Sequence, residues 1–345
     1  MNKRSDEFDI LFTLNHPAHV HLFKNLINKF KNDGHRVHIV ARNKDITLKL
    51  LDNLGLEYQV APINTVPYLH NGIELINRAI LLNKLHRRYK FKYAIGSDTS
   101  IAHIVNVKSF VVAEDDDDYT KIFSYITYPF VYKIINPSCL RFEKWKDKRV
   151  LHNSYHELAY LHPANFTPDV KILGKYGLEK YKYIVVRFSA LKAFHDTRAK
   201  GISGKLWGGI EKLLRGYEVI KSVENERTHR IELWDIHHIL AFAKMLICDS
   251  QTMTIEGSVL GTPSIRINTF VGKSSVIDEL EWKYKLAIGI LPDKEDDILK
   301  TIQSILDEPI TDRIWAERRA RLLREKIDFN QWLIEFFESL EEVKK

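Results

Sequence analysis

The sequence predicts an α/β fold made of two Rossmann-like domains with a cleft between them. Short apolar, β-branched segments alternate with segments of helical periodicity along nearly the whole chain, and the alternation begins again after the middle. The length of 345 residues is enough for two domains of ordinary size. Such alternation is typical of parallel sheets with helices on their faces, and the lack of a short internal repeat argues against a solenoid.

Residues 1–152 are expected to form the first domain. Apolar, β-branched runs predict strands at residues 8–14, 37–41, 58–61, 93–95, 109–113 and 133–136, the last being the final strand of this half. After a turn at residues 16–21, helical spacing predicts helices at residues 20–33, 46–54 and 73–89. Gly34 and Gly55 follow the first two helices, as glycine often does just past a helix end.

Residues 153–310 are expected to form a second domain of the same kind, after a boundary near residues 149–163. Strands are predicted at residues 183–188, 218–221, 245–248 and 264–267, and helices at residues 204–214, 236–242, 253–260 and 296–306. Residues 311–345 are strongly helical and amphipathic. We expect this segment to form a helix or helices that pack back across the domain boundary.

The composition favours anionic partners. The formal net charge is +7 and the isoelectric point is about 9.1, which suits nucleotides or anionic lipid surfaces. Because 45 acidic residues are interspersed with 52 basic ones and no zinc-finger or RNA-binding signature is present, we do not expect nucleic acid as a partner. A plain basic, solvated surface is the alternative.

Cysteine usage and the N-terminus indicate a cytoplasmic protein. Cys139 and Cys248 are too few for a disulfide framework or a cysteine metal site. Residues 1–7 are polar, unlike a signal peptide, and no apolar stretch is long enough to span a bilayer. Any membrane contact would be peripheral, at the inner face, through basic and aromatic patches that also occur on ordinary soluble surfaces: Lys24, Lys29, Lys31, Tyr125 and Tyr128.

The segment 246–265 is the most informative part of the chain. An apolar strand stops at Asp249, small hydroxylated residues follow, and a helix starts at once. The first N–H groups of a helix have no internal partner and lie at the positive end of its dipole, so a diphosphate placed there accepts their hydrogen bonds. Ser250 and Thr252 can add hydroxyl donors, and Glu256 can accept from ribose hydroxyls. The alternative is a plain N-cap with a solvated glutamate.

This segment resembles the nucleotide-binding motif of UDP-N-acetylglucosamine 2-epimerases, which reads D-S-G-G-x-x-E-E before a helix and L-G-x-P. Gln251 and Thr252 replace the two glycines, and the matching residues are Asp249, Ser250, Glu256, Leu260, Gly261 and Pro263. The resemblance implies that Ser250 and the backbone amides of Gln251 and Thr252 hold the diphosphate. It also implies that Glu256 holds the ribose.

The whole chain is similar to an uncharacterised family of GT-B-like proteins, classed as a domain of unknown function. The matching pieces run across both halves and are residues 15–21, 34–37 and 155–163, Val186-Arg187 and the segment just described. The resemblance implies a GT-B-like fold with two Rossmann-like domains, and it implies no established activity.

His16, His19 and His21 lie around the first strand-to-helix turn, which should face the cleft. Because histidine titrates near neutral pH, one of them is a candidate general base for an acceptor hydroxyl. The turn resembles the Gly-His-x-x-Pro turn of the lipid-linked N-acetylglucosaminyltransferase of peptidoglycan synthesis, which singles out His19, although Pro17 and Ala18 replace its glycines. A polar surface and a metal site are the alternatives.

Carboxylates follow the fourth and fifth predicted strands. Asp98 lies in a Gly-Ser-Asp-Thr turn that resembles the H-G-D-T turn of the epimerases, whose aspartate is catalytic, and helix capping is its alternative. Glu114 falls where the epimerases place a catalytic glutamate, and it opens a run of five carboxylates, residues 114–118. Adjacent carboxylates repel one another, so we expect raised pKa values or a cationic partner. The run is a candidate base, metal site or solvated loop.

In the second half, Arg187 ends the first strand, where a guanidinium can bind a diphosphate bidentately and stabilise a leaving nucleotide. The epimerases have a catalytic histidine followed by arginine in this region, and its absence here argues against simple 2-epimerase activity. Weaker candidates are Ser222 and Glu224 for base or ribose, His237 beside the nucleotide, Ser189 and His195 as cleft residues, and Asn268, Thr269, Phe270 and Lys273 beside the sugar.

Together these residues predict a metal-independent, nucleotide-sugar-dependent glycosyltransferase of polysaccharide or glycoconjugate synthesis. A UDP-sugar would be the donor substrate, with no separate cofactor, and a saccharide or lipid-linked acceptor would be the partner. Arg187, Ser250 and Thr252 would stabilise the departing diphosphate, and His19 or a nearby carboxylate would activate the acceptor hydroxyl. Two other functions remain open: a nucleotide-sugar 2-epimerase or hydrolase, and a non-enzymatic nucleotide-binding protein.

Overall fold

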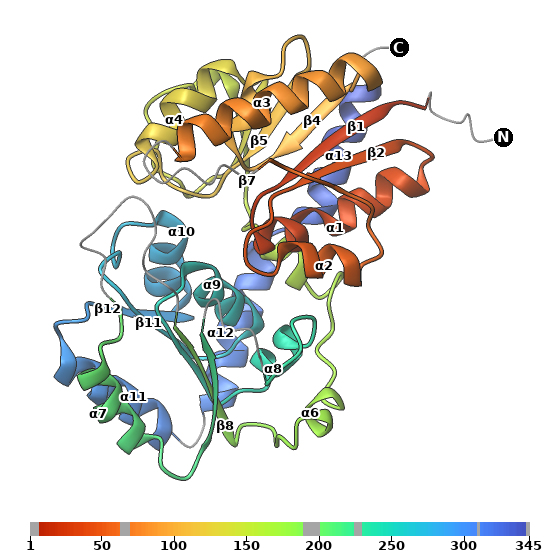
Figure 1. Cartoon of the computed structure of the whole chain (residues 1–345). Helices are drawn as coiled ribbons and strands as arrows, with labels where there is room; N and C mark the ends of the chain where they lie inside the picture. Colours follow the sequence, from red (N-terminus) through yellow and green to blue (C-terminus); the bar gives the residue numbers. More distant parts are fainter. Residues whose placement is uncertain (1–6, 63–69, 189–200, 224–229, 309–310, 343–345) are drawn as a thin grey trace. The chain divides into compact units, whose positions relative to one another are not determined.

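The computed structural model of the chain describes residues 7–62, 70–188, 201–223, 230–308 and 311–342 (Figure 1). The chain divides into two compact units. Unit 1 comprises residues 1–160 and 328–345, and unit 2 comprises residues 161–327. Each unit contains one parallel sheet with helices on its faces. Unit 1 therefore takes its last helix from the C-terminal end of the chain.

Unit 1 is built on a seven-stranded sheet of order β3-β2-β1-β4-β5-β6-β7, in which every neighbouring pair is parallel. The strands are β1 (Asp9–Leu14), β2 (Arg36–Ala41), β3 (Gln59–Val60), β4 (Tyr93–Gly96), β5 (Lys108–Val112), β6 (Lys133–Pro137) and β7 (Arg149–His152). The expectation that residues 133–136 form the last strand of this half is wrong, because β7 pairs with β6 beyond it. Strand order reverses between β1 and β4, which is where open parallel sheets bind ligands.

Helices cover both faces of this sheet because successive residues of its strands point to opposite faces. Leu11 and Val111 belong to the core beneath α3, whereas Phe110 packs against Phe337 of α13 with ring centroids 5.0 Å apart. The helices are α1 (Pro17–Asn32), α2 (Thr47–Asn53), α3 (His70–Tyr89), α4 (Lys121–Thr127), α5 (Leu158–Leu161) and α13 (Phe329–Glu342) (Figure 1). Short 3₁₀ turns add η1 (Thr99–His103), η2 (Tyr128–Phe130) and η3 (Lys146–Lys148).

Unit 2 has a five-stranded parallel sheet of order β12-β11-β10-β8-β9, which reverses between β10 and β8. The strands are β8 (Tyr183–Phe188), β9 (Glu218–Val223), β10 (Met245–Cys248), β11 (Ser264–Ile267) and β12 (Ala287–Ile290). The helices are α6 (Ile172–Lys175), α7 (Gly204–Leu213), α8 (Ile236–Ala241), α9 (Gln251–Leu260), α10 (Ser275–Asp278), the π-helix η4 (Glu279–Tyr284), α11 (Glu295–Asp307) and α12 (Thr311–Glu325). Val186 and Ile247 form its core with Ile210 of α7 and Ile298 of α11.

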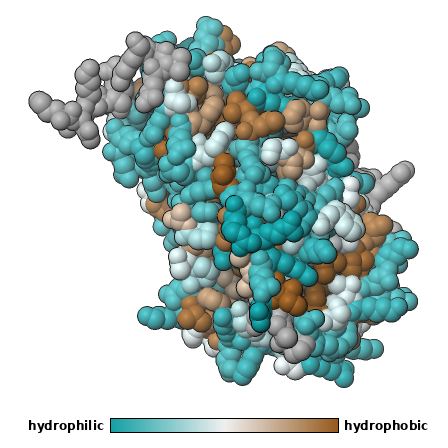
Figure 2. Space-filling view, turned by 180° about the vertical axis from the view of Figure 1, so that it is seen from behind, coloured by the Kyte–Doolittle hydropathy of each residue, from teal (hydrophilic) through white to brown (hydrophobic). Residues whose placement is uncertain are grey.

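The face of the molecule seen in Figure 2 is largely hydrophilic, with hydrophobic residues in separate groups between the polar ones. This distribution agrees with a charged fraction of 28%. Within the part of the chain that the structure describes, no helix combines the length and the apolar character needed to cross a membrane.

Candidate functional site

The carboxyl ends of the strands in unit 1 bring several predicted residues to one edge of its sheet. His19 comes after β1, Asp98 after β4 and Glu114 after β5. These three strands are neighbours in the sheet, and β1 and β4 flank the reversal of strand order. The three side chains therefore come from segments that follow adjacent strands, at the position where this class of sheet binds ligands.

The first helix begins earlier than the sequence predicted. We expected a turn over residues 16–21, but α1 starts at Pro17, whose fixed φ angle and missing N–H suit the first helical position. His16 is the N-cap, and its Nδ1 accepts a hydrogen bond from the Ala18 N–H at 3.2 Å. His19 therefore belongs to the first turn of a helix, which fixes its position more firmly than a loop would.

The ring of His19 is held in one tautomer. Its Nδ1 accepts a hydrogen bond from the Asn15 N–H at 3.3 Å. Burial lowers the pKa of His19 to about 4, with Asp98 opposing the shift and Lys44 adding to it, so the ring is neutral at pH 7. A neutral imidazole that accepts at Nδ1 carries its proton on Nε2. This arrangement favours a role as hydrogen-bond donor to a substrate oxygen over the role of general base.

Asp98 has one oxygen committed to the fold and one available for chemistry. It is 7% exposed, and it is the N-cap of η1. Its Oδ1 accepts from the Ser100 N–H at 2.8 Å and from the Ser100 hydroxyl. Its Oδ2 is buried and has no hydrogen-bond partner among the described residues. The capping role and the catalytic role are thus compatible, because each uses a different oxygen.

Glu114 contacts a histidine that the sequence did not single out. Its Oε1 accepts from the N–H of His156 at 2.9 Å, and its Oε2 lies 3.5 Å from Nδ1 of the same residue. Burial and the proximity of His19 lower the pKa of His156 to about 3. Its Nε2 is buried without a hydrogen-bond partner in the described part of the chain. The only sequence signal was its place in the family motif at residues 155–163.

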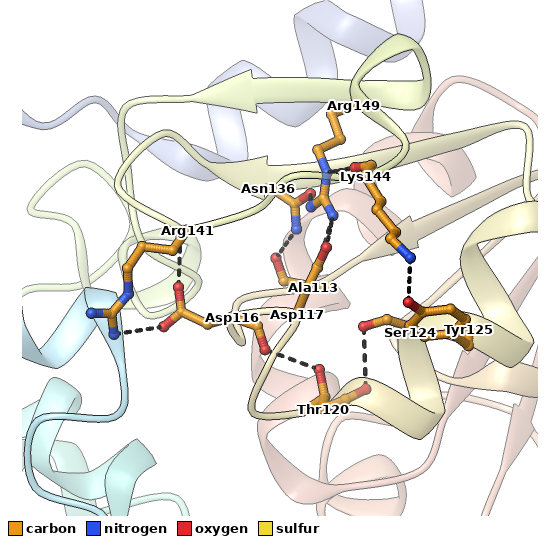
Figure 3. A network of polar contacts seen from close by, with 10 residues as sticks. All are labelled: Ala113, Asp116, Asp117, Thr120, Ser124, Tyr125, Asn136, Arg141, Lys144 and Arg149. Atoms are coloured by element: carbon orange, nitrogen blue, oxygen red, sulfur yellow. Dashed lines mark hydrogen bonds and ion pairs between the residues drawn. The ribbon is translucent and has the colours of Figure 1, made fainter.

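Two further carboxylates of the acidic run contact arginines (Figure 3). Asp117 accepts two hydrogen bonds from Arg149 Nη2, at 2.6 and 2.7 Å, and the Arg149 side chain is 1% exposed. Asp116 accepts from the Arg141 N–H at 2.7 Å. Burial and the neighbouring Asp116 raise the pKa of Asp115 to about 6. The expectation that some of these carboxylates have raised pKa values or a cationic partner is confirmed. The described ranges contain no group of three or more His, Cys, Asp or Glu residues placed to hold a metal.

In unit 2, α9 begins directly after β10, at the reversal of strand order. Ser250 is its N-cap, and its Oγ accepts from the Met253 N–H at 3.4 Å, which leaves the hydroxyl proton for a ligand. Nε2 of Gln251 is buried and lacks a hydrogen-bond partner among the residues described. Thr252, the next residue, is half-buried. The helix therefore starts with several donors that the fold does not use.

Arg187 lies on the strand next to this helix start. In the parallel pairing of β8 with β10 it stands opposite Cys248, the last residue of β10. Its Nη1 donates to Ser222 Oγ at 2.6 Å. Ser222 is inside β9, opposite Arg187, and not after that strand as the sequence suggested. Because of this position its contact is with the guanidinium, and it orients the arginine.

His237 of α8 and Glu256 of α9 form a buried pair. His237 Nε2 lies 3.0 Å from Glu256 Oε1, and the two side chains are 6% and 9% exposed. The sequence placed both residues beside the nucleotide but gave no sign that they touch. A buried carboxylate held by an imidazole has a fixed orientation, which suits recognition of two vicinal hydroxyls.

The loop after β11 is tied to the same edge. Asn268 is buried, and its Nδ2 donates to the backbone carbonyl of Asp249 at 2.7 Å, while its Oδ1 accepts from the Phe270 N–H at 2.9 Å. Asn268 therefore holds two loops together, and Lys273 on the same loop is exposed. The weaker candidates Ser189, His195 and Glu224 lie outside the described residues.

The chain forms two compact units, and each has a parallel sheet that reverses its strand order and carries candidate residues at its carboxyl edge. This is a GT-B-like α/β fold of two Rossmann-like domains. The chain belongs to the family described as "Protein of unknown function (DUF354)", whose model matches residues 8–309. No curated protein matches the sequence.

Solved structures share this fold at low sequence identity. MnaA of S. aureus, solved with UDP, has a TM-score of 0.69 at 11% identity, covering 96% of this chain and 97% of that one. The UDP-GlcNAc 2-epimerase of Methanocaldococcus jannaschii, in complex with UDP-GlcNAc and UDP, has a TM-score of 0.64 at 12% identity, covering 87% and 93%. A glycosyltransferase from Rickettsia africae has a TM-score of 0.59 at 14% identity, covering 99% of each chain. At these identities the likeness establishes the fold alone.

Proposed function

We propose that the protein is a nucleotide-sugar-dependent glycosyltransferase that holds its donor on unit 2. The start of α9 carries this proposal, because it combines the positive end of a helix dipole with donors that the fold leaves unused at a reversal of strand order. Ser250, Gln251 and Thr252 would donate to the diphosphate. The similar structures from S. aureus and Methanocaldococcus jannaschii were solved with UDP, which makes UDP the first nucleotide to test.

The groups around α9 suit the other parts of a nucleoside diphosphate. Arg187, oriented by Ser222, would pair its guanidinium with the charge of the bound diphosphate. Glu256, oriented by His237, would accept hydrogen bonds from the ribose hydroxyls. These roles need no metal, since a guanidinium and helix N–H groups supply the positive charge. A metal-independent reaction remains part of the proposal.

The groups of unit 1 would supply the acid–base chemistry. The unpartnered Oδ2 of Asp98 is the strongest candidate for the base that removes a proton from an acceptor hydroxyl, because a buried carboxylate oxygen without hydrogen bonds accepts readily. His19, neutral and protonated on Nε2, would hold a substrate oxygen. We assign the general-base role to Asp98 for this reason. A saccharide or a lipid-linked saccharide is the acceptor class that this chemistry serves.

The donor site is tested by comparing two serine caps of unit 2. Ser250 caps α9 and Ser203 caps α7, and both helices have 10 residues. Replacing either serine by alanine should lower the free energy of unfolding by about 1 kcal/mol, because each removes one cap. Only Ser250→Ala should also weaken UDP binding, by roughly tenfold, in calorimetric titrations with UDP, UDP-sugars, GDP and CMP. A folded wild-type chain that binds none of these nucleotides would overturn the proposal.

A second function, nucleotide-sugar 2-epimerase or hydrolase, is favoured by the pair of carboxylates Asp98 and Glu114 at the edge of unit 1. It differs from a transferase in needing no acceptor. Turnover of a UDP-sugar incubated alone with the protein, followed by NMR of the sugar, would support this second function. Release of UDP only when an acceptor saccharide is added would support the transferase. Nucleotide binding with neither reaction would leave the non-enzymatic function.

A further inference from the structure

One region of unit 1 exposes an unusual share of large hydrophobic side chains. More than half of those exposed among the described residues fall between Ile76 and Tyr132. Ile122 is 70% exposed, Ile80 is 62% exposed and Phe130 is 60% exposed. Scattered exposed hydrophobic residues need no explanation, but a group of them on neighbouring elements marks an interaction surface.

A stripe along α3 lines a groove in this region. The groove has a volume of about 810 Å³. Its α3 residues recur at helical spacing and change from apolar to basic along the helix, from Ile76 and Ile80 to Lys84 and Arg87. Val105, which is 65% exposed, also lines the groove. The groove-lining side of α3 is therefore apolar toward the start of the helix and basic toward its end.

The next elements of the chain pack beside this groove. His103, which also lines it, has its ring 5.3 Å from that of Phe130 in η2. Thr99 at the start of η1 is hydrogen-bonded to Thr127 at the end of α4, Oγ1 to Oγ1, at 3.0 Å. We call the combined surface the α3–α4 face and define it by Ile76, Ile80, Lys84, Arg87, Ile122 and Phe130.

The charge on the α3 part of this face is positive. Lys84, Arg87 and the exposed Lys121 at the start of α4 have no ion-pair partner among the described residues. The carboxylate of α3, Glu74, is 1% exposed and lies 2.8 Å from Arg42 Nε, so it does not offset them. Such a face has these cations beside exposed aliphatic and aromatic side chains. It therefore suits a partner whose outer layer is anionic and whose deeper layer is apolar.

We propose that the α3–α4 face docks on an anionic lipid bilayer. A bilayer matches both properties of the face, because its headgroups attract lysine and arginine and its acyl boundary takes up isoleucine and phenylalanine side chains. The protein would attach to the bilayer surface without crossing it, in agreement with the lack of a membrane-crossing helix in the described part of the chain. This inference does not rest on the proposed donor site, since lipid binding is measured without nucleotide.

The electrostatic part is tested with the full chain and sedimenting vesicles. Vesicles of phosphatidylcholine mixed with phosphatidylglycerol should bind the protein, and vesicles of phosphatidylcholine alone should bind it far more weakly. Lys84→Gln with Arg87→Gln should lower partitioning onto the anionic vesicles by roughly 25-fold, at about fivefold for each basic residue. The control, Lys212→Gln with Arg215→Gln, removes the same charge from exposed positions of unit 2 and should change binding less than twofold.

The apolar part is tested with Ile80→Ser and Ile122→Ser, which keep the net charge. Together they should lower partitioning by roughly tenfold, because less apolar surface enters the acyl boundary. The control is Trp282→Ser, at a side chain of unit 2 that is 78% exposed. The proposal is overturned if the folded wild type does not prefer anionic vesicles, or if the control variants lose as much binding as the others. Light scattering that shows a dimer dissociated by Ile80→Ser would instead assign the face to a second copy of the chain.

Discussion

The two units share a plan but differ in the chemistry at their sheet edges. In unit 1 the reversal of strand order is surrounded by ionisable side chains: His19, Asp98, Glu114 and His156. In unit 2 the corresponding edge offers a helix start capped by Ser250, a Gln251 amide without a hydrogen-bond partner among the described residues, and an arginine held by a serine, beside the buried pair of His237 and Glu256. The same backbone arrangement thus presents groups that can move protons in one unit and groups that can hold an anion in the other.

We infer from this difference that the edge of unit 1 carries out the chemistry and the edge of unit 2 binds the nucleotide. A variant of one edge that changes both turnover and nucleotide affinity would contradict this inference. A change at the edge of unit 1 should affect turnover and leave nucleotide affinity intact. A change at the edge of unit 2 should do the reverse. If either edge controls both quantities equally, the division of labour is wrong, even if the proposed reaction is correct.

The largest effect is expected from Asp98→Asn. Because the amide cannot accept a proton, turnover of nucleotide-sugar should fall about 10²- to 10⁴-fold, whereas the Kd for UDP should change less than twofold. Steady-state rates and calorimetry measure the two quantities. Asp118→Asn, at an exposed position of the same acidic run, is the matched control and should leave both unchanged. A parallel loss of UDP binding in Asp98→Asn would break the comparison.

A second effect concerns the acid sensitivity of unit 1. The pKa of His156 is lowered to about 3, so the folded state favours the neutral ring, and the stability this contributes is present above the ordinary pKa of 6.5 and lost as the pH falls toward 3. The unfolding free energy of the wild type should therefore fall relative to that of His156→Gln by about 1 kcal/mol per pH unit in this window. Denaturant midpoints at pH 7 and pH 5 check this.

Asp115, whose pKa is raised to about 6, makes the unfolding free energy change with pH in the opposite direction. This contribution is the same in the wild type and in His156→Gln, so it cancels in the difference between them. Above pH 7 the difference between wild type and His156→Gln should not depend on pH. A difference that stays constant from pH 7 to pH 5 would show that the ring of His156 is not held in its neutral form by the fold.

The smallest effect is expected from Ser222→Ala. Loss of its contact frees the guanidinium of Arg187 to move, so UDP affinity should fall by about two- to tenfold while the rate at saturating donor stays the same. Calorimetry and saturation kinetics separate these quantities. Ser304→Ala, at an exposed serine of α11, is the control and should change neither. A lower saturated rate in Ser222→Ala would place this residue in the chemistry as well as in binding.

The sequence was most informative where local pattern determines structure. Alternating apolar runs predicted most strands of both sheets, and the strand–turn–helix segment after Cys248 predicted the start of α9. It failed for β7, because Arg149 and His152 leave that strand only two apolar residues, and its formation depends on pairing with β6. It also missed the contacts of His156 with Glu114, since these residues are 42 positions apart and no local pattern relates them.

One feature of the topology affects the order in which the chain acquires its structure. The aromatic core of unit 1 is completed by Phe337, whose ring lies 5.0 Å from that of Phe110 and 5.7 Å from that of Tyr93. During synthesis the strands of unit 1 leave the ribosome first, yet their core waits for α13, after the whole of unit 2. Unit 2 is contiguous and can fold as soon as it is made. The aromatic core of unit 1 therefore stays incomplete while the whole of unit 2, residues 161–327, is synthesised.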